Sequence, residues 1–361
     1  MLTLLLACHP LATDVASDSG RQEGTGDPET GLEDTQLSFD LLYSLPDDQK
    51  VGRVRFPAGI MSEPEIIWEW LLSSEFPDRI HKPHGLAVVG DEVVVTSFDY
   101  YTDSFISTLD LETGAYLETN LASAGLDWAG EPRLNKTRAA HNAVPVGEGW
   151  VVSDSHNHRL LGLNAQFEFA WEISQDTLDD PYLSRYFSGP NDVETLDMDG
   201  VTHLLVSARG DEFNHLLLFA PAEPLRPWDA PWEITWRWPQ QDDHSLLYQN
   251  HNPHPIDGGL MVADSMHNRL LKVSWEGEIL WEFPGPDCPE GSLNWPRDAV
   301  YTPDGSLLIS DSRGERIIAV RADAECIDED SLLWSWDDLG GPYQLEILRF
   351  SSATSWRSPG R

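Results

Sequence analysis

Two stretches of the chain decide its fold: HNAVPVGEGWVVSDSHNHRLL at residues 141–161 and HNPHPIDGGLMVADSMHNRLL at residues 251–271. They align without a gap, and His, Asn, Pro, Gly, Asp, Ser and Arg recur at matching positions along the same alternating apolar run. Weaker copies occupy residues 83–97, 190–209 and 296–316. Short strands joined by polar turns, repeating every 46–60 residues, are typical of propeller blades. The first residues of the five copies are His84, His141, Asn191, His251 and Arg297.

The number of copies predicts the architecture. Each copy also has a fourth strand that carries Trp, which gives four strands per repeat. Five full copies run from about residue 82 to residue 338. Residues 37–70 supply strands before the first copy, and residues 344–350 supply one after the last, so we expect a sixth blade that joins the two ends and leaves no large exposed sheet edge. The predicted fold is therefore all-β, a six-bladed β-propeller of four-stranded antiparallel blades over residues 37–361; seven blades would need shorter repeats.

The charge of the chain excludes some partners. Among 361 residues there are 61 Asp+Glu and 23 Lys+Arg, a formal net charge of −38. Nucleic acid needs a basic surface, so no nucleic-acid partner is expected. Electrostatic docking on anionic lipid is disfavoured for the same reason. The hydrophobic content of 40% is sufficient for a folded core.

The N-terminus predicts a location in the bacterial cell envelope. Residues 4–8 read LLLAC and resemble the end of a lipoprotein signal, in which Cys8 is acylated and becomes the mature N-terminus. We therefore expect a signal end at residues 1–8 and a disordered acidic tether at residues 9–36. No stretch of 18 apolar residues exists, so contact with a membrane is expected only through the lipid anchor, on the outer membrane or in the periplasm. A chance apolar start on a cytosolic protein is the alternative.

The remaining cysteines and the recurrent Trp and Asp residues have structural interpretations. An oxidising exterior permits a disulfide between Cys288 and Cys326, although two unpaired thiols fit the sequence equally well. The Trp residues are expected to pack between blades. The Asp, Asn and Arg of the repeated turn between the second and third strands are expected to stabilise that turn, with calcium binding as the minor interpretation. These turn residues are Asp154, Asn157, Arg159, Asp264, Asn268, Arg269, Asp311 and Arg316.

One pattern points to chemistry. The first position of the repeat holds His in three copies, and in a propeller this position begins the innermost strand, at the mouth of the central channel. Imidazole groups near a guanidinium suit an anionic, oxygen-rich ligand, because Arg offers forked donors and His acts as a nucleophile, acid or base near neutral pH. The alternative is that each His bonds a backbone carbonyl of the next blade. The candidate set is His84, His141, His251 and Arg297, with Arg138, Asn191 and His254 as candidate substrate-binding residues.

Three features resemble the bacterial aryl-sulfate sulfotransferases: the His-Asn or His-Gly at the blade start, the D-S-x-x-N-R turn, and the G-x-I-L-W-E-F sequence at residues 277–283. The turn is also similar to NHL repeats, which occur in binding proteins as well as enzymes. The sulfotransferase resemblance implies that a channel His takes a sulfuryl group from an aryl sulfate and passes it to a phenol, without a cofactor. By position His251 is the implied nucleophile, His84 and His141 are acid/base or sulfate-binding groups, and Arg297 is the charge clamp.

Two other classes of function stay open. Three channel His could hold a zinc ion, and peptide-amidating lyases are similar in having His at the blade starts of a six-bladed propeller. Their ligands come from alternate blades, whereas here the His residues lie in the first, second and fourth full copies. The protein could also be a non-catalytic module that binds protein or glycan, with the acidic loops 118–136 and 174–190 suited to that role.

Overall fold

The computed structural model describes residues 38–77, 81–98, 104–120, 139–210, 214–223, 231–240, 243–289 and 292–349. The predictions for the signal end, the tether, Cys8 and Arg138 concern residues outside these ranges. None of the described helices is long and apolar enough to cross a membrane.

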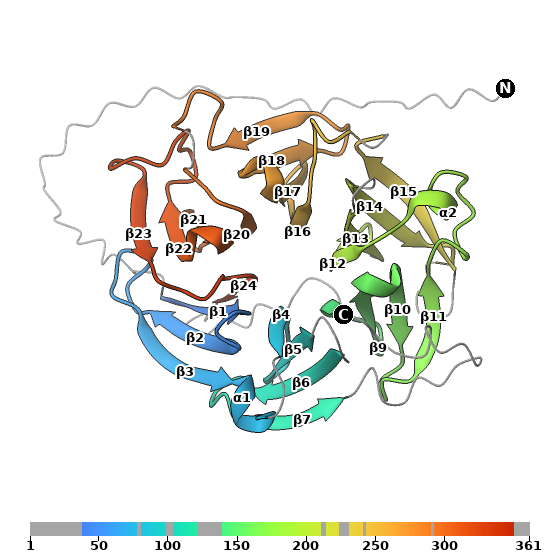
Figure 1. The fold of residues 1–361 in the computed structure, drawn as a ribbon, viewed down its shortest axis with the longest axis horizontal. Helices are drawn as coiled ribbons and strands as arrows, with labels where there is room; N and C mark the ends of the chain where they lie inside the picture. Colours follow the sequence, from blue (N-terminus) through green and yellow to red (C-terminus); the bar gives the residue numbers. More distant parts are fainter. Residues whose placement is uncertain are drawn as a thin grey trace, which may run out of the picture. The chain divides into compact units, whose positions relative to one another are not determined.

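The described chain forms six four-stranded antiparallel sheets that follow one another around a ring, as Figure 1 shows. This confirms the predicted six-bladed β-propeller. Blade 1 consists of β24 (Leu345–Arg349), β1 (Phe39–Leu45), β2 (Lys50–Phe56) and β3 (Glu65–Leu71). Blade 2 consists of β4 (Lys82–Val89), β5 (Glu92–Phe98), β6 (Ser104–Asp110) and β7 (Tyr116–Asn120). Blade 3 consists of β8 (Ala140–Val146), β9 (Gly149–Asp154), β10 (Arg159–Leu163) and β11 (Phe169–Ile173).

The second half of the ring repeats this pattern. Blade 4 consists of β12 (Pro190–Met198), β13 (Val201–Arg209), β14 (Asn214–Pro221) and β15 (Trp232–Trp238). Blade 5 consists of β16 (Asn250–Ile256), β17 (Gly259–Asp264), β18 (Arg269–Ser274) and β19 (Ile279–Phe283). Blade 6 consists of β20 (Pro296–Tyr301), β21 (Leu307–Asp311), β22 (Arg316–Val320) and β23 (Leu332–Trp336). The short helices are α1 (Leu72–Glu75), α2 (Leu183–Tyr186), η1 (Ser155–Asn157), η2 (Ser265–His267) and η3 (Ser312–Gly314).

The two ends of the described chain meet in blade 1. Strand β24 pairs antiparallel with β1, from Phe39 opposite Arg349 to Tyr43 opposite Leu345. β24 therefore takes the innermost place that β4, β8, β12, β16 and β20 take in the other blades. Each of these inner strands contacts the next, and β24 contacts both β20 and β4, which closes the ring. The predicted closure by terminal strands is confirmed.

Apolar side chains fill the spaces between neighbouring blades. One core cluster joins Phe39 and Val54 of blade 1 to Leu308 and Ile317 of blade 6. The Trp residues on the outer strands extend this packing: the indole N–H of Trp68 donates to the backbone carbonyl of Leu111 in the next blade at 2.9 Å. The inter-blade packing predicted for the Trp residues is found at such positions.

The repeated turn is held by an Asp–Arg pair in three blades. The Nε atoms of Arg159, Arg269 and Arg316 donate to Asp154, Asp264 and Asp311 at 2.7–2.8 Å. The second oxygen of each of the last two carboxylates accepts a backbone N–H from the segment that enters its blade, at Tyr248 and Asn294. These Asp residues therefore stabilise the scaffold, as predicted.

Parts of the two predicted loops are regular structure. Residues 118–120 belong to β7, and residues 183–186 of the second segment form α2. Pro190, the last residue of the second segment, begins β12, and residues 121–136 of the first segment lie outside the described ranges.

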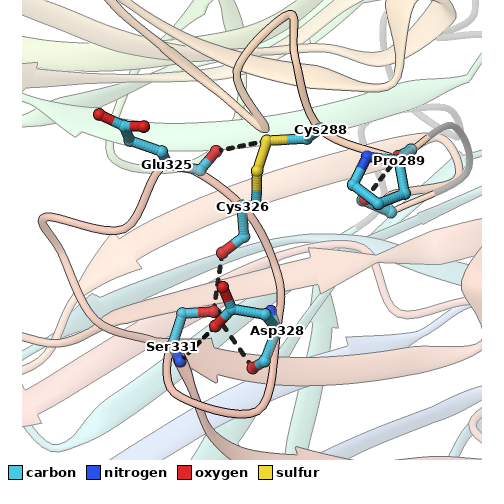
Figure 2. The surroundings of a disulfide bond; sticks show 7 residues. Cys288, Pro289, Glu325, Cys326, Asp328 and Ser331 are labelled. Atoms are coloured by element: carbon cyan, nitrogen blue, oxygen red, sulfur yellow. Dashed lines mark hydrogen bonds between the residues drawn. A yellow bond between two sulfur atoms is a disulfide. The ribbon is translucent and has the colours of Figure 1, made fainter.

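A disulfide joins Cys288, between β19 and β20, to Cys326, between β22 and β23, with their Cα atoms 5.5 Å apart. It settles the alternative left open by the sequence. Figure 2 shows how the blade 6 side of the bond is held: the Ser331 hydroxyl donates to the Cys326 carbonyl at 2.7 Å, and the Asp328 N–H donates to the same hydroxyl at 2.8 Å. The bond ties the outer connections of blades 5 and 6 together.

Loss of this disulfide should lower the stability of the protein. The bridged residues are 38 positions apart, and the chain-entropy model assigns a loop of this size roughly 4 kcal/mol. We expect the variant Cys288→Ser/Cys326→Ser to lose about 2–4 kcal/mol of unfolding free energy in denaturant titrations. Dithiothreitol should destabilise the wild type and leave the variant unchanged; equal effects on both would contradict the assignment.

Candidate functional site

Six residues near the start of the six inner strands meet, and Tyr343 lies among them. The sequence predicted five of them, and Tyr343, which precedes β24, is the sixth. A signal for it exists, because Pro342-Tyr343 repeats the Pro-x pair of Pro83-His84, Pro190-Asn191 and Pro296-Arg297. We call these six residues the hub ring. All but Arg297 are nearly fully buried: His84 4%, His141 3%, Asn191 0%, His251 0% and Tyr343 1% exposed.

Tyr343 contacts each of the other members. Its hydroxyl accepts the side-chain N–H of Asn191 at 2.8 Å and lies 3.0 Å from Nδ1 of His141. Its ring centroid lies 4.5 Å from that of His84 and 6.0 Å from that of His251. The guanidinium carbon of Arg297 lies 4.8 Å from the same ring centroid, within cation–π range. The geometric convergence expected of the three His and Arg297 is therefore present, whereas their catalytic roles stay predictions.

The hydrogen bonds of His251 fix its tautomer. The Ser265 hydroxyl donates its single hydrogen to the carbonyl of Pro296, so it accepts at 2.7 Å the hydrogen carried by Nδ1 of His251. Nε2 of His251 then carries a lone pair, and this atom is contacted by Nη1 of Arg297. The arrangement requires an uncharged imidazole.

Electrostatics agree with this assignment. Burial, followed by the positive charges of Arg297 and Arg209, holds the pKa of His251 well below its usual value of 6.5. The pKa values of His84 and His141 are also held well below this value, first by burial and then in part by the same two guanidinium groups. Burial raises the pKa of Tyr343, which keeps its hydroxyl protonated. At neutral pH the hub ring thus holds neutral imidazoles beside a fixed positive charge.

Arg209 is a site residue that the sequence reasoning missed. It lies at the end of β13, where its Nε donates to the side-chain oxygen of Asn191 at 2.8 Å and its Nη1 donates to Gln249 at 2.7 Å. Arg209 does not stand at a blade start, so the repeat pattern alone does not mark it. It adds a second guanidinium at the edge of the hub ring.

The scaffold alternative required each His to bond a backbone carbonyl of the next blade, and the ring hydrogen bonds of the three His residues go elsewhere; His251 contacts the next blade through the side chain of Arg297. His84 bonds the carbonyl of Lys82 in its own strand at 2.9 Å, while His141 and His251 bond side chains. The following positions connect the blades instead: Asn142 donates to the carbonyl of Val193, and Gln344 exchanges two hydrogen bonds with the backbone of Leu86. The hydrogen bonds between blades are therefore made by the residues that directly follow the hub ring residues in the sequence.

A second cluster of charged groups lies three positions further along the inner strands. It comprises Glu194, His254 and Glu346, together with Asp298, and we call it the lower cluster. His254 donates from Nε2 to Asp298 at 2.6 Å. Burial alone would lower the pKa of His254, but Asp298 and the two glutamates raise it to about 9. The structure therefore places His254, a candidate substrate-binding residue, in the lower cluster.

The glutamates of this cluster keep their protons to higher pH than usual. Burial is the main cause that raises the pKa of Glu194 to about 8 and that of Glu346 to about 7; nearby carboxylates contribute to the rise and His254 opposes it. Glu194, His254 and Glu346 come from blades 4, 5 and 1, and Asp298 of blade 6 lies one position after Arg297. Blades 2, 3 and 6 place the apolar residues Ala87, Val144 and Val300 at the position three after the hub ring.

The hub ring does not fit a zinc site. In the part of the chain that the structure describes, no group of three or more His, Cys, Asp or Glu side chains is placed to hold a metal ion. Tyr343 lies between the imidazoles, and the lone pair of His251 faces the guanidinium of Arg297. A cation-binding site needs converging lone pairs without a competing positive charge.

Comparisons with known proteins place the chain by its fold. No protein-family model matches it, and no curated protein matches it in sequence. Among solved structures it is similar to a putative 6-phosphogluconolactonase from Bacteroides uniformis, with TM-score 0.56 and 12% identity over 87% of this chain and 100% of the other. A chain of a nidogen/laminin complex gives TM-score 0.54 and 13% identity over 86% and 98%. The periplasmic gluconolactonase of Pseudomonas aeruginosa gives TM-score 0.50 and 12% identity over 86% and 99%.

The six four-stranded sheets define the class, the six-bladed β-propellers, and at 12–13% identity these similarities concern the fold alone. The chain is a six-bladed β-propeller with a hub ring of mixed His, Arg, Asn and Tyr side chains.

The lower cluster should make stability fall between pH 7 and pH 9. Glu194, Glu346 and His254 have folded pKa values of about 8, 7 and 9, all above their usual values of 4.5 and 6.5. The folded state therefore binds protons that the unfolded state has released, and this stabilisation is lost as pH rises through the folded values. We expect the unfolding free energy to fall on the order of 2 kcal/mol across this interval, measured by urea titration. The variant Glu194→Gln/Glu346→Gln should show a flatter profile; an unchanged slope would contradict this prediction.

Proposed function

We propose that the hub ring is an oxyanion site at which His251 takes a sulfuryl group from an aryl sulfate and transfers it to a phenol. The observation that carries the proposal is the state of His251: its Nδ1 proton is held by Ser265, and its Nε2 lone pair faces Arg297. A neutral imidazole beside a guanidinium is suited to attack on a sulfur atom whose oxygens the guanidinium binds. The sequence resemblance to aryl-sulfate sulfotransferases supports the same chemistry.

The transfer consists of two displacements at sulfur. As the bond from Nε2 of His251 to sulfur forms, the bond from sulfur to the aryl oxygen breaks, and the phenolate leaves with the electron pair. The phenol oxygen of the acceptor then attacks sulfur, the N–S bond breaks, and its electron pair returns to Nε2, while the acceptor's proton goes to solvent. Arg297 leaves Nε2 for the sulfuryl oxygens in the first displacement, and Arg209 adds positive charge at the edge of the hub ring.

The location in the cell envelope is part of this proposal. The signal-like residues ending in Cys8 support a lipid anchor, and the disulfide between Cys288 and Cys326 supports an oxidising compartment. Metabolic labelling with a palmitate analogue should mark the wild type expressed in a bacterial host, and Cys8→Ser should abolish the label and release the protein from the membrane fraction. Unlabelled wild type in the cytosol would contradict the proposal.

A non-catalytic binding function is the second candidate, and one observation favours it. His251, Asn191 and Tyr343 are at most 1% exposed, and Arg297 covers the Nε2 atom of His251. A hub ring that never opens would serve as a structural plug, and ligands such as a protein or glycan would then bind on the outer surfaces. The two candidates differ in whether the hub ring admits an anion.

The activity assay measures release of a chromogenic phenol from its sulfate ester in the presence of a phenolic acceptor. We expect turnover by the wild type and a loss of at least about 10³-fold in kcat/KM for His251→Ala, because nucleophile removal blocks the first displacement. Ser265→Ala should lose about 10–100-fold, since the imidazole is then free to adopt the other tautomer. The control His244→Ala changes an exposed residue outside the hub ring and should be as active as the wild type.

Three results would contradict the proposal. They are no turnover by folded wild-type protein, full turnover by His251→Ala, and hydrolysis of gluconolactone without action on sulfate esters, since lactone hydrolysis is the activity named for two of the structurally similar proteins.

A further inference from the structure

An aromatic groove lies on the outer side of blades 4 and 5, away from the hub ring. It has a volume of about 560 Å³, which is in the range of small-molecule sites. Trp236 and Trp238 of β15 form one wall, and Trp275, in the turn between β18 and β19, contributes to the other. Trp238 is buried between the blades, whereas Trp236 and Trp275 are half-buried and supply the indole surface that is open to a ligand.

The indole rings are held in fixed positions. The N–H of Trp236 donates to the carbonyl of Trp275 at 2.7 Å, and the N–H of Trp238 donates to the carbonyl of Gly277 at 3.0 Å. The rings of Trp236 and Trp275 are nearly perpendicular, at 82°, with centroids 5.4 Å apart. The N–H groups of Trp236 and Trp238 are thus bonded to backbone carbonyls and are not available to a ligand. The rings of Trp236 and Trp275 form a rigid corner that offers a ligand its π surface.

The charge of the groove is negative. Asp243 and Glu276 line it, and no Lys, Arg or His is among the described residues that do. Hydrogen bonds from Ser245 lower the pKa of Asp243, so this carboxyl stays ionised. The side-chain N–H of Gln240 is bonded to the carbonyl of Arg237 at 2.9 Å. The groove therefore offers π surface and carboxylates but few hydrogen-bond donors.

We propose that this groove binds a small, free quaternary ammonium cation. Such a cation gains cation–π attraction at the indole corner and Coulomb attraction from the two carboxylates, and it needs no hydrogen-bond donor. A sugar needs donors and acceptors in alternation, and a neutral apolar ligand gains nothing from the carboxylates. The proposal is independent of the sulfuryl-transfer function.

Other grooves of the structure provide a comparison. The groove between blades 5 and 6 includes Arg269 in its lining, which repels a cation. The groove between blades 6 and 1 has Trp334, Trp336 and a single carboxylate, Glu63. The groove between blades 4 and 5 therefore combines the larger negative charge with three indoles, and Glu63 supplies a matched control position.

Choline and its uncharged isostere 3,3-dimethylbutan-1-ol are the probes, and isothermal titration calorimetry of the full chain is the measurement. We expect saturable choline binding and at least about tenfold weaker binding of the isostere, because only the charge differs. Trp275→Ala should weaken choline binding at least about tenfold. Glu276→Gln, an exposed side chain whose replacement leaves the fold intact, should weaken it about threefold, and Glu63→Gln should leave it unchanged.

The opposite results overturn the proposal. These are equal affinity for the two probes, wild-type affinity in Glu276→Gln, and a loss in Glu63→Gln as large as that in Glu276→Gln. Binding of phosphatidylcholine vesicles without binding of free choline would assign the groove to a lipid surface instead, and binding of methyl glucoside in preference to choline would assign it to a glycan.

Discussion

The pairing of β24 with β1 is the interaction on which the rest of the structure depends. It closes the ring of inner strands, so that six residues from positions as distant as 84 and 343 meet within contact distance. The same pairing places Tyr343 between the imidazoles and under the guanidinium of Arg297. Without this pairing, β1 would be an exposed sheet edge and the hub ring would be open to solvent on the side of blade 1. The strand pairing that closes the propeller therefore also completes the hub ring.

The inner strands separate charge by level. The hub ring has neutral imidazoles and the guanidinium of Arg297, with that of Arg209 at its edge, whereas the lower cluster has three carboxyl groups and His254. Asp298 of the lower cluster accepts the backbone N–H groups of Ala299 and Leu345, and Asp192, which follows Asn191 of the hub ring, accepts that of Asn252. The bonds to Leu345 and Asn252 connect neighbouring blades. The two guanidinium groups at the hub ring are the positive charges that the proposed anion would contact.

The sequence predicted the fold and much of the hub ring because each copy of the repeat contains both the strand pattern of a blade and one hub ring residue at its start. The blade-start position of the repeat identified His84, His141 and His251, and the terminal strands completed the blade count.

Tyr343 was missed because the closing blade takes its inner strand from the far end of the chain, where only the Pro-x pair of the repeat is retained. Arg209 was missed because it reaches the hub ring from the end of a second strand. The role of Ser265 could not be predicted from strand register, because His251 pairs with Ala263 and Ser265 lies after the end of β17, in η2. The level at which His254 lies could not be predicted, because a bulge between His251 and His254 shifts the strand.

The central claim is that the hub ring is an anion site built on a neutral His251, and ¹⁵N NMR of histidine-labelled protein tests it most directly. The account predicts an Nδ1-protonated, uncharged His251 that stays neutral below pH 6.5, and a change at its Nε2 resonance when inorganic sulfate draws Arg297 away. A His251 that titrates at or above pH 6.5, or imidazole resonances that do not respond to sulfate, would contradict it.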